Sequence, residues 1–219
     1  MDFFTQNQLF FLYIVNLSFI AYVRYTNSGF IKRNLLAVLN YNTALQIQKS
    51  EINKKSVTNF FLSLNFYISV TVFSIYVLGK FKLIPEEINH FLIFIFILIA
   101  LFFIVYINSG ISFISAYIFK LKPIAVDFHR NNKNIYHAFG IILIFINILI
   151  SFSEISNFAF FSGIILFGIF YLFRILRFIK INLSKHMNSF YLFLYLCAVE
   201  IFPILYIVKI FTLFYPATN

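Results

Sequence analysis

FYLFLYLCAVEIFPILYIVKIFTLF, residues 190–214, is the stretch that decides the fold class. It is apolar almost throughout, and it is longer than the roughly 20 residues that a helix needs to cross a bilayer. It nevertheless contains one carboxylate, Glu200, and Pro203 follows one turn later. An ionisable group is costly at this depth in a membrane and commonly marks a functional site. The stretch therefore predicts a transmembrane helix with a polar feature inside it.

The whole chain has the composition of a membrane protein. Of its 219 residues, 62% are hydrophobic and 11% are charged, and the mean hydropathy is +0.91. A soluble domain carries about 25% charged residues, so this chain lacks the polar groups that would cover a water-exposed surface. Its long continuous apolar runs predict helices and not the alternating segments of a barrel. We predict an all-α, polytopic membrane helical bundle, with residues 1–219 as a single transmembrane domain.

Six apolar runs are predicted to form transmembrane helices. They cover residues 9–23, 57–78, 91–119, 135–152, 158–179 and 190–214. At 1.5 Å per residue, the third run is roughly 43 Å long, more than the hydrocarbon core requires. Asn108, Ser109 and Gly110 interrupt it. It is therefore either one long helix that projects beyond the membrane or a helix broken into two pieces.

Two polar segments separate these runs. Residues 24–55 mix leucines with Asn and Gln, which predicts either an interfacial helix between helices one and two or an irregular loop. Residues 120–134, KLKPIAVDFHRNNKN, are predicted as a solvated polar loop. It holds Asp127 and His129 and lies close to His137, but their spacing matches no metal or acid–base motif. We expect no cofactor and no metal, and the single cysteine, Cys197, excludes an internal disulfide.

The distribution of Lys and Arg predicts the orientation. Fourteen of the 17 basic residues fall in the first, third and fifth connections, and only Lys80, Lys82 and Lys209 fall on the other side. Because cytoplasmic loops are enriched in Lys and Arg, both termini are predicted to lie outside, in the periplasm. The basic residues behind the net charge of +10 lie at the ends of apolar runs, so they are interpreted as an orientation signal. No nucleic-acid partner is expected.

Five residues are candidates for polar or anionic contacts. Glu200 beside Pro203 is either a proton or substrate site or an interhelical hydrogen bond that fixes packing. Arg174, Arg177 and Lys180 share one face at a helix end and are predicted to contact lipid headgroups or other anions. Arg174, the deepest of the three, is also a candidate for the intramembrane polar site, as a partner of Glu200 or of an anionic ligand. No catalytic residue is assigned, because the sequence contains no HExxH, GxSxG or phosphate-binding glycine loop.

Polar and small residues inside the other runs are predicted to pack the bundle. Interhelical hydrogen bonds are expected from Asn16, Asn65, Asn108 and Asn147, and close helix packing is expected at Gly140, Gly163 and Gly168.

Segments of three runs resemble a known family. FYLFLYLCAVEIFPILYIVKIF in the sixth run, YLFRILR in the fifth and NIYHAFGIILIF in the fourth are similar to inner-membrane proteins of Bacteroidota that are catalogued as a domain of unknown function. The resemblance implies a bacterial inner-membrane location and no activity. It marks Tyr195, Leu196, Cys197, Glu200 and Pro203 as family positions without assigned roles.

Three functions are compatible with the sequence. The leading one is a non-enzymatic integral inner-membrane subunit or scaffold of an envelope complex, whose partners are membrane lipids and other integral membrane or envelope proteins. The alternative is a small proton-coupled transporter or channel that uses Glu200, although such proteins usually show internal repeats. A lipid-modifying enzyme ranks third. It would need Arg174, Arg177, His186 and Asp127 to converge, and nothing in their spacing orders them into a mechanism.

Overall fold

The computed structural model describes residues 6–40, 57–81, 89–118 and 122–184 together with Lys209. This part of the chain is all-α and forms six helices: α1 (Gln6–Thr26), α2 (Phe30–Leu39), α4 (Val57–Lys80), α5 (His90–Ile118), α6 (Lys122–Phe152) and α7 (Ser156–Ser184). All except α2 are long and apolar enough to cross a membrane, which gives five candidate spans and indicates a multi-pass membrane protein. The predicted sixth span, with Glu200 and Pro203, lies outside the described residues apart from Lys209.

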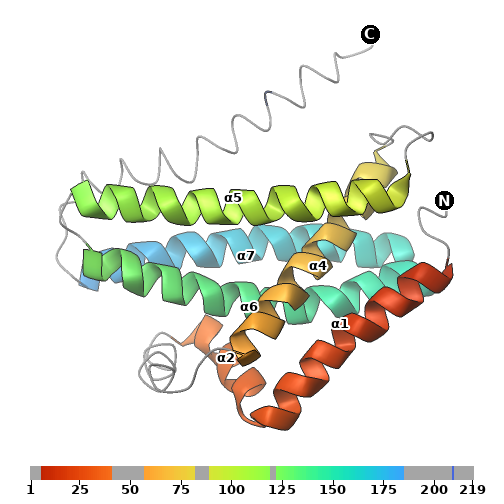
Figure 1. The fold of residues 1–219 in the computed structure, drawn as a ribbon, viewed down its shortest axis with the longest axis horizontal. Coiled ribbons are helices and arrows are strands. Elements are labelled where there is room, and N and C mark those ends of the chain that lie inside the picture. Colours follow the sequence, from red (N-terminus) through yellow and green to blue (C-terminus); the bar gives the residue numbers. More distant parts are fainter. Residues whose placement is uncertain (1–5, 41–56, 82–88, 119–121, 185–208, 210–219) are drawn as a thin grey trace.

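Helix α6 is the centre of the bundle. It packs most extensively against α4 and α7 and also contacts α2, α5 and α1. Figure 1 shows α5 and α7 running alongside α6, whereas α4 crosses it and α1 lies against α4. Phe66, Val70 and Phe73 of α4 pack with Phe139 and Leu143 of α6 in one buried cluster. Their spacing of three and four residues puts each set on one helix face, so one stripe of each helix enters the core.

Large apolar side chains also cover the outside of the bundle. Phe96 on α5 is 74% exposed and Phe158 on α7 is 73% exposed. No residue in the most apolar window of α5 is buried inside the protein. Contiguous apolar surface of this extent would favour aggregation in water. Hydrocarbon accommodates these side chains because they are apolar. The backbone polar groups need no water there either, because they are already satisfied within each helix.

The third apolar run is one uninterrupted helix, α5, so the alternative of two pieces is wrong. The side-chain Oδ1 of Asn89 accepts a hydrogen bond from the backbone N–H of Phe91 at 3.0 Å. An acceptor at this position satisfies one of the N–H groups that a helix start leaves free. Asn108 and Ser109 do not break the helix, because their side chains face a pocket between α5, α6 and α7 and not their own backbone.

The loop predicted at residues 120–134 is wrong, because α6 already begins at Lys122. The polar segment continues the helix and buries one of its faces. Phe128 and Asn132 are both buried, and the Phe128 ring packs edge-on against Phe178 of α7, with 4.8 Å between the ring centroids. Tertiary packing of this face stabilises a helix that the local polar composition does not favour.

Helix α7 also runs further than predicted. The predicted run ends at residue 179, whereas α7 continues to Ser184. Ile181 is completely buried, so the last turn of this helix is held by packing.

Residues 30–39 form helix α2, so the helical alternative is confirmed for this part of the segment 24–55. The helix packs against α6. Asn34 and Ala37 are buried, whereas Leu35 and Leu36 on the opposite face are exposed. This division into two faces is typical of a helix that lies on the side of a bundle.

Arg177 of α7 holds the C-terminal end of α2. Its Nη2 donates hydrogen bonds to the carbonyl oxygens of Ala37 and Val38, both at 2.6 Å, and the residue is only 6% exposed. The last carbonyls of a helix lack intrahelical donors and carry partial negative charge, so a guanidinium is a favourable partner. Contact of Arg177 with lipid headgroups stays a prediction.

Two of the three glycines predicted as close-packing points lie against another helix. A Cβ added to Gly140 would lie 2.6 Å from the Phe66 Cα, and one added to Gly163 would lie 2.3 Å from the Phe73 ring. Gly168 differs, because no atom of the described residues lies within 4 Å of its Cβ position. The prediction therefore holds for Gly140 and Gly163 and is not met at Gly168.

Candidate functional site

A line of buried polar side chains, here called the polar file, runs between α1, α2, α4 and α6. It consists of Tyr13, Asn16, Asn34, Ser63, Asn65, Ser69, Tyr76, His137, Asn147 and Ser151. Ser63 and Tyr76 lie about 20 Å apart along the α4 axis at 1.5 Å per residue. The hydrocarbon core is about 30 Å thick, so the file extends over most of its depth.

One end of the file is a cluster of three hydroxyl groups. The Tyr13 hydroxyl lies 2.7 Å from Ser151 Oγ and 3.3 Å from the Tyr76 hydroxyl. Tyr76 and Ser151 are 2.6 Å apart. The Asn147 carbonyl accepts from both Tyr13, at 3.2 Å, and Ser151, at 2.8 Å. Each hydroxyl has one proton and can also accept, so the hydrogen bonds in this cluster can reverse direction.

Next to the hydroxyl cluster in the polar file, Ser69 of α4 connects three helices. Its Oγ accepts a hydrogen bond from Asn16 Nδ2 at 3.0 Å, and its carbonyl accepts from Asn147 Nδ2 at 2.8 Å. All three residues are at most 1% exposed. The interhelical hydrogen bonds predicted for Asn16 and Asn147 are thereby confirmed. Ser69 is thus the junction that links α1 and α6 through α4.

Asn65 lies one turn further along α4 and makes no such bond. It is fully buried, and neither its Oδ1 nor its Nδ2 has a hydrogen-bond partner among the described residues. Leaving a buried amide unsatisfied costs about 1–3 kcal/mol per group. Buried polar atoms of this kind commonly bind internal water, and Asn65 is the amide of the file that lacks a described partner at both side-chain atoms.

His137 forms the other end of the file. Its Nε2 lies 3.1 Å from Ser63 Oγ, and its Nδ1 lies 3.3 Å from Asn34 Nδ2. Ser63 donates its own proton to the Asn59 carbonyl at 2.8 Å, so it accepts from His137. The bonds therefore assign the proton to Nε2 and make Nδ1 the acceptor for Asn34.

At the ends of the file, His137 and Tyr13 are buried, but a neighbour of each is partly exposed. Tyr76 and Ser63 are partly exposed, whereas Asn65, Ser69 and Asn147 between them are buried. A polar path whose middle is closed to bulk water can pass only very small species, of which the proton is the smallest.

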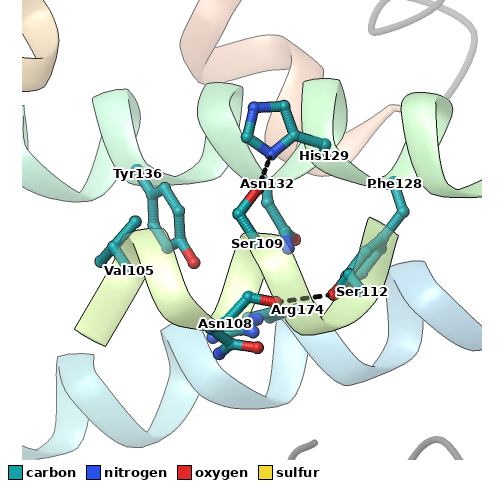
Figure 2. A pocket seen from close by; sticks show the side chains of 9 residues that line it. All are labelled: Val105, Asn108, Ser109, Ser112, Phe128, His129, Asn132, Tyr136 and Arg174. Atoms are coloured by element: carbon teal, nitrogen blue, oxygen red, sulfur yellow. Dashed lines mark hydrogen bonds between the residues drawn. The ribbon is translucent and has the colours of Figure 1, made fainter. Parts of the chain in front are cut away.

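A second polar feature is a small pocket between α5, α6 and α7, shown in Figure 2. Its volume is about 30 Å³, and its lining residues are Val105, Asn108, Ser109, Ser112, Phe128, His129, Asn132, Tyr136 and Arg174. Ser109 Oγ lies 3.0 Å from His129 Nδ1. Arg174 reaches in from α7 beside Asn108, so the pocket contains a cation and several neutral polar groups.

The candidates from the sequence fall in different places. Arg174 lines the pocket, Arg177 binds α2, and Lys180 is exposed on α7. Glu200 and Pro203 are outside the described residues. Asn108, predicted to bond another helix, has an Oδ1 with no hydrogen-bond partner in the described part of the chain. The described candidates for anionic contacts, Arg174, Arg177 and Lys180, therefore lie outside the polar file, whereas Asn16, Asn65 and Asn147 lie within it.

Sequence reasoning missed Tyr13, Tyr76, Ser151 and the structural role of His137. The spacing of polar residues could have indicated these contacts. His137, Asn147 and Ser151 lie on one face of α6 together with Gly140, and Asn65, Ser69 and Tyr76 lie on one face of α4. His137 was grouped with the supposed loop before it, which concealed this spacing. Within the described ranges, no group of three or more His, Cys, Asp or Glu residues could hold a metal ion.

Comparison with known proteins finds one match. The family model named Domain of unknown function (DUF4271) matches residues 9–211, which is most of the chain. No curated protein and no solved structure matches.

Proposed function

The chain belongs to the DUF4271 family, a domain of unknown function, and we propose that it conducts protons across the bacterial inner membrane along the polar file. The sequence alone ranks a complex subunit first and a proton-coupled transporter or channel second. The observation that favours the second is the polar file itself, which is hydrogen-bonded at both ends and has an unsatisfied buried amide, Asn65, in its middle.

A proton can move along this file without a net change at any residue. At one end, a hydroxyl of the Tyr13, Ser151 and Tyr76 cluster accepts a proton and releases its own to the next oxygen. At the other end, the Asn34 amide must first turn away from His137 Nδ1, because an amide does not release its proton; His137 then accepts a proton at Nδ1 from a water molecule and releases the one at Nε2 to Ser63. Each group then reorients to its starting state, as relays of hydroxyl and imidazole groups require.

The middle of the path requires water. Ser63 and Ser69 are about 9 Å apart along the α4 axis, which is about three hydrogen-bond lengths. Asn65 lies between them, and its amide offers both donors and acceptors to bound water. One or two water molecules at Asn65 would therefore connect the hydroxyl cluster to His137.

We further propose six spans with both termini in the periplasm. The positive-inside distribution of Lys and Arg supports this orientation, and the apolar residues 190–214 supply the sixth span. The end of the bundle that contains His137 and α2 then faces the cytoplasm, and the end that contains Tyr76 faces the periplasm.

The proposal is tested by proton flux into liposomes that contain the purified protein, measured with a pH-sensitive dye. Wild-type protein is expected to raise the flux above that of empty liposomes. Asn65→Leu is expected to reduce the added flux at least about tenfold, because it removes the group that holds water in the path. Since Asn65 bonds no described residue, its loss should not lower stability.

The matched control is Thr71→Val on the same helix. Thr71 is equally buried, but its hydroxyl bonds only the Tyr67 carbonyl of its own helix among the described residues, at 2.8 Å. Its flux should equal that of the wild type. Equal flux in Asn65→Leu and wild-type liposomes, or no flux above empty liposomes, would refute the proposal.

A subunit role is the second candidate, and Gly168 favours it, because no described residue lies within 4 Å of its Cβ position. Small residues on an outward helix face allow a helix of another membrane protein to approach closely. A photo-crosslinking residue at Leu172, which is 57% exposed one turn away, should give one discrete protein adduct in native membranes. The same residue at Tyr25, 90% exposed on α1, should give none. Identical adduct patterns at the two positions would remove this candidate.

A further inference from the structure

We propose that the pocket between α5, α6 and α7 binds the phosphate group of a membrane phospholipid. The inference is independent of proton conduction, because the pocket shares no residue with the polar file. It rests on the depth of the pocket, on its polar groups and on the lipid-facing surface beside it.

The depth of the pocket matches the level of lipid phosphates. Arg174 lies about 27 Å along the α7 axis from Ser156, at 1.5 Å per residue. Asn108 lies about 26 Å along α5 from Phe91 by the same measure. Ser156 and Phe91 begin candidate spans at the opposite end, and the hydrocarbon core is about 30 Å thick. Both helices therefore place the pocket at the edge of the hydrocarbon, close to the headgroups of one leaflet.

The polar groups suit a phosphate. The Arg174 guanidinium presents several N–H donors in a plane that matches phosphate oxygens, and Figure 2 shows it within the ring of lining residues. Asn132 is 7% exposed, and its Oδ1 has no hydrogen-bond partner among the residues described. An amide can rotate to exchange its oxygen and its NH₂ group, so Asn132 can turn a donor towards an anion. Asn108 has the same option.

The size of the pocket limits what enters it. A volume of about 30 Å³ corresponds to about two water molecules. One or two phosphate oxygens fit this space, whereas the rest of a headgroup must stay at the mouth. His129 is exposed there, and Tyr106 and Phe102 of α5 are 70% and 51% exposed. These aromatic rings offer the adjoining apolar surface on which acyl chains can lie.

The test is native mass spectrometry of the whole protein, released from detergent after addition of phosphatidylglycerol. Wild-type protein is expected to retain one tightly held lipid. Arg174→Gln should weaken its retention about tenfold, since it removes a charge-assisted hydrogen bond. Arg130→Gln removes the same charge from an exposed position on α6 and should change retention less than about twofold.

A second variant keeps the test valid if Arg174→Gln does not fold. Asn132→Leu removes an amide oxygen that bonds no described residue, so the protein should fold. Its lipid retention should fall about threefold or more. Retention by both variants at the wild-type level would overturn the proposal.

Two further arms separate the possible sources of the anion. Inorganic phosphate in excess should leave the lipid bound, because the acyl chains also contribute to its affinity. Displacement of the lipid by phosphate would mean a site for a free anion and would contradict the proposal. Glu200→Gln should leave lipid retention unchanged. A fall in retention to the level of Arg174→Gln would mean that the lipid depends on Glu200 and not on this pocket alone, which would equally contradict it.

Discussion

Replacing Gly140 with alanine should lower the free energy of unfolding by about 2–3 kcal/mol, the cost of overpacking a tight core. The added Cβ would lie 2.6 Å from the Phe66 Cα and 2.9 Å from Asn65 Nδ2. The first of these atoms is backbone and cannot turn away, so α4 and α6 would have to separate. Because α6 is the central helix and α4 one of its two main neighbours, the separation would disturb the whole bundle. Thermal unfolding in detergent should show a fall in Tm of several degrees.

Gly168→Ala is the matched control for this substitution. It makes the same chemical change at a helical glycine of α7 whose Cβ position has no described atom within 4 Å. Its stability should equal that of the wild type or rise slightly, because alanine favours helix more than glycine does. Equal losses of Tm in the two variants would mean that α4 and α6 do not approach each other closely at Gly140.

Arg177→Gln should detach helix α2 from the bundle and cost about 3 kcal/mol. Arg177 donates two short hydrogen bonds to the end of α2, and a hydrogen bond to a charged group contributes about 1.5–3 kcal/mol. Glutamine is too short to reach both carbonyls from α7. Hydrogen exchange of the backbone amides of residues 30–39 should accelerate strongly, while exchange in α4 and α6 should change much less.

Lys180→Gln is the control for the loss of positive charge. Lys180 lies three residues further along α7 and is exposed, so its substitution should change stability by less than about 0.5 kcal/mol. Unchanged exchange in α2 after Arg177→Gln would mean that this arginine does not hold the helix.

The spans were predictable from the sequence, whereas the polar contacts between them were not. A helix in lipid needs a long apolar run, and such a run can be recognised from the local sequence. The predicted runs 57–78 and 91–119 therefore agree within two residues with the observed bounds of α4 and α5. The first part of α6 was missed because its helix depends on burial of Phe128 and Asn132 against other helices. Burial against other helices cannot be predicted from the local sequence, and the polar composition of that segment favours a loop.

The polar file shows the same limit at the level of single residues. Asn16 and Asn147 were predicted to bond other helices, and they do. That they meet at Ser69, and that Tyr13 meets Ser151, depends on how far each helix is rotated about its own axis. Rotation is set by packing against neighbours, so side chains 138 residues apart in sequence, such as these two, become partners only in the folded bundle.

The measurement that tests proton conduction most directly is the reversal potential of the purified protein in a planar bilayer with a pH gradient. A path that passes only protons should shift this potential by about 59 mV per pH unit, the value for a single charge, and the current should fall in Asn65→Leu. A reversal potential that does not respond to the pH gradient, or no current above that of the bare bilayer, would contradict the account.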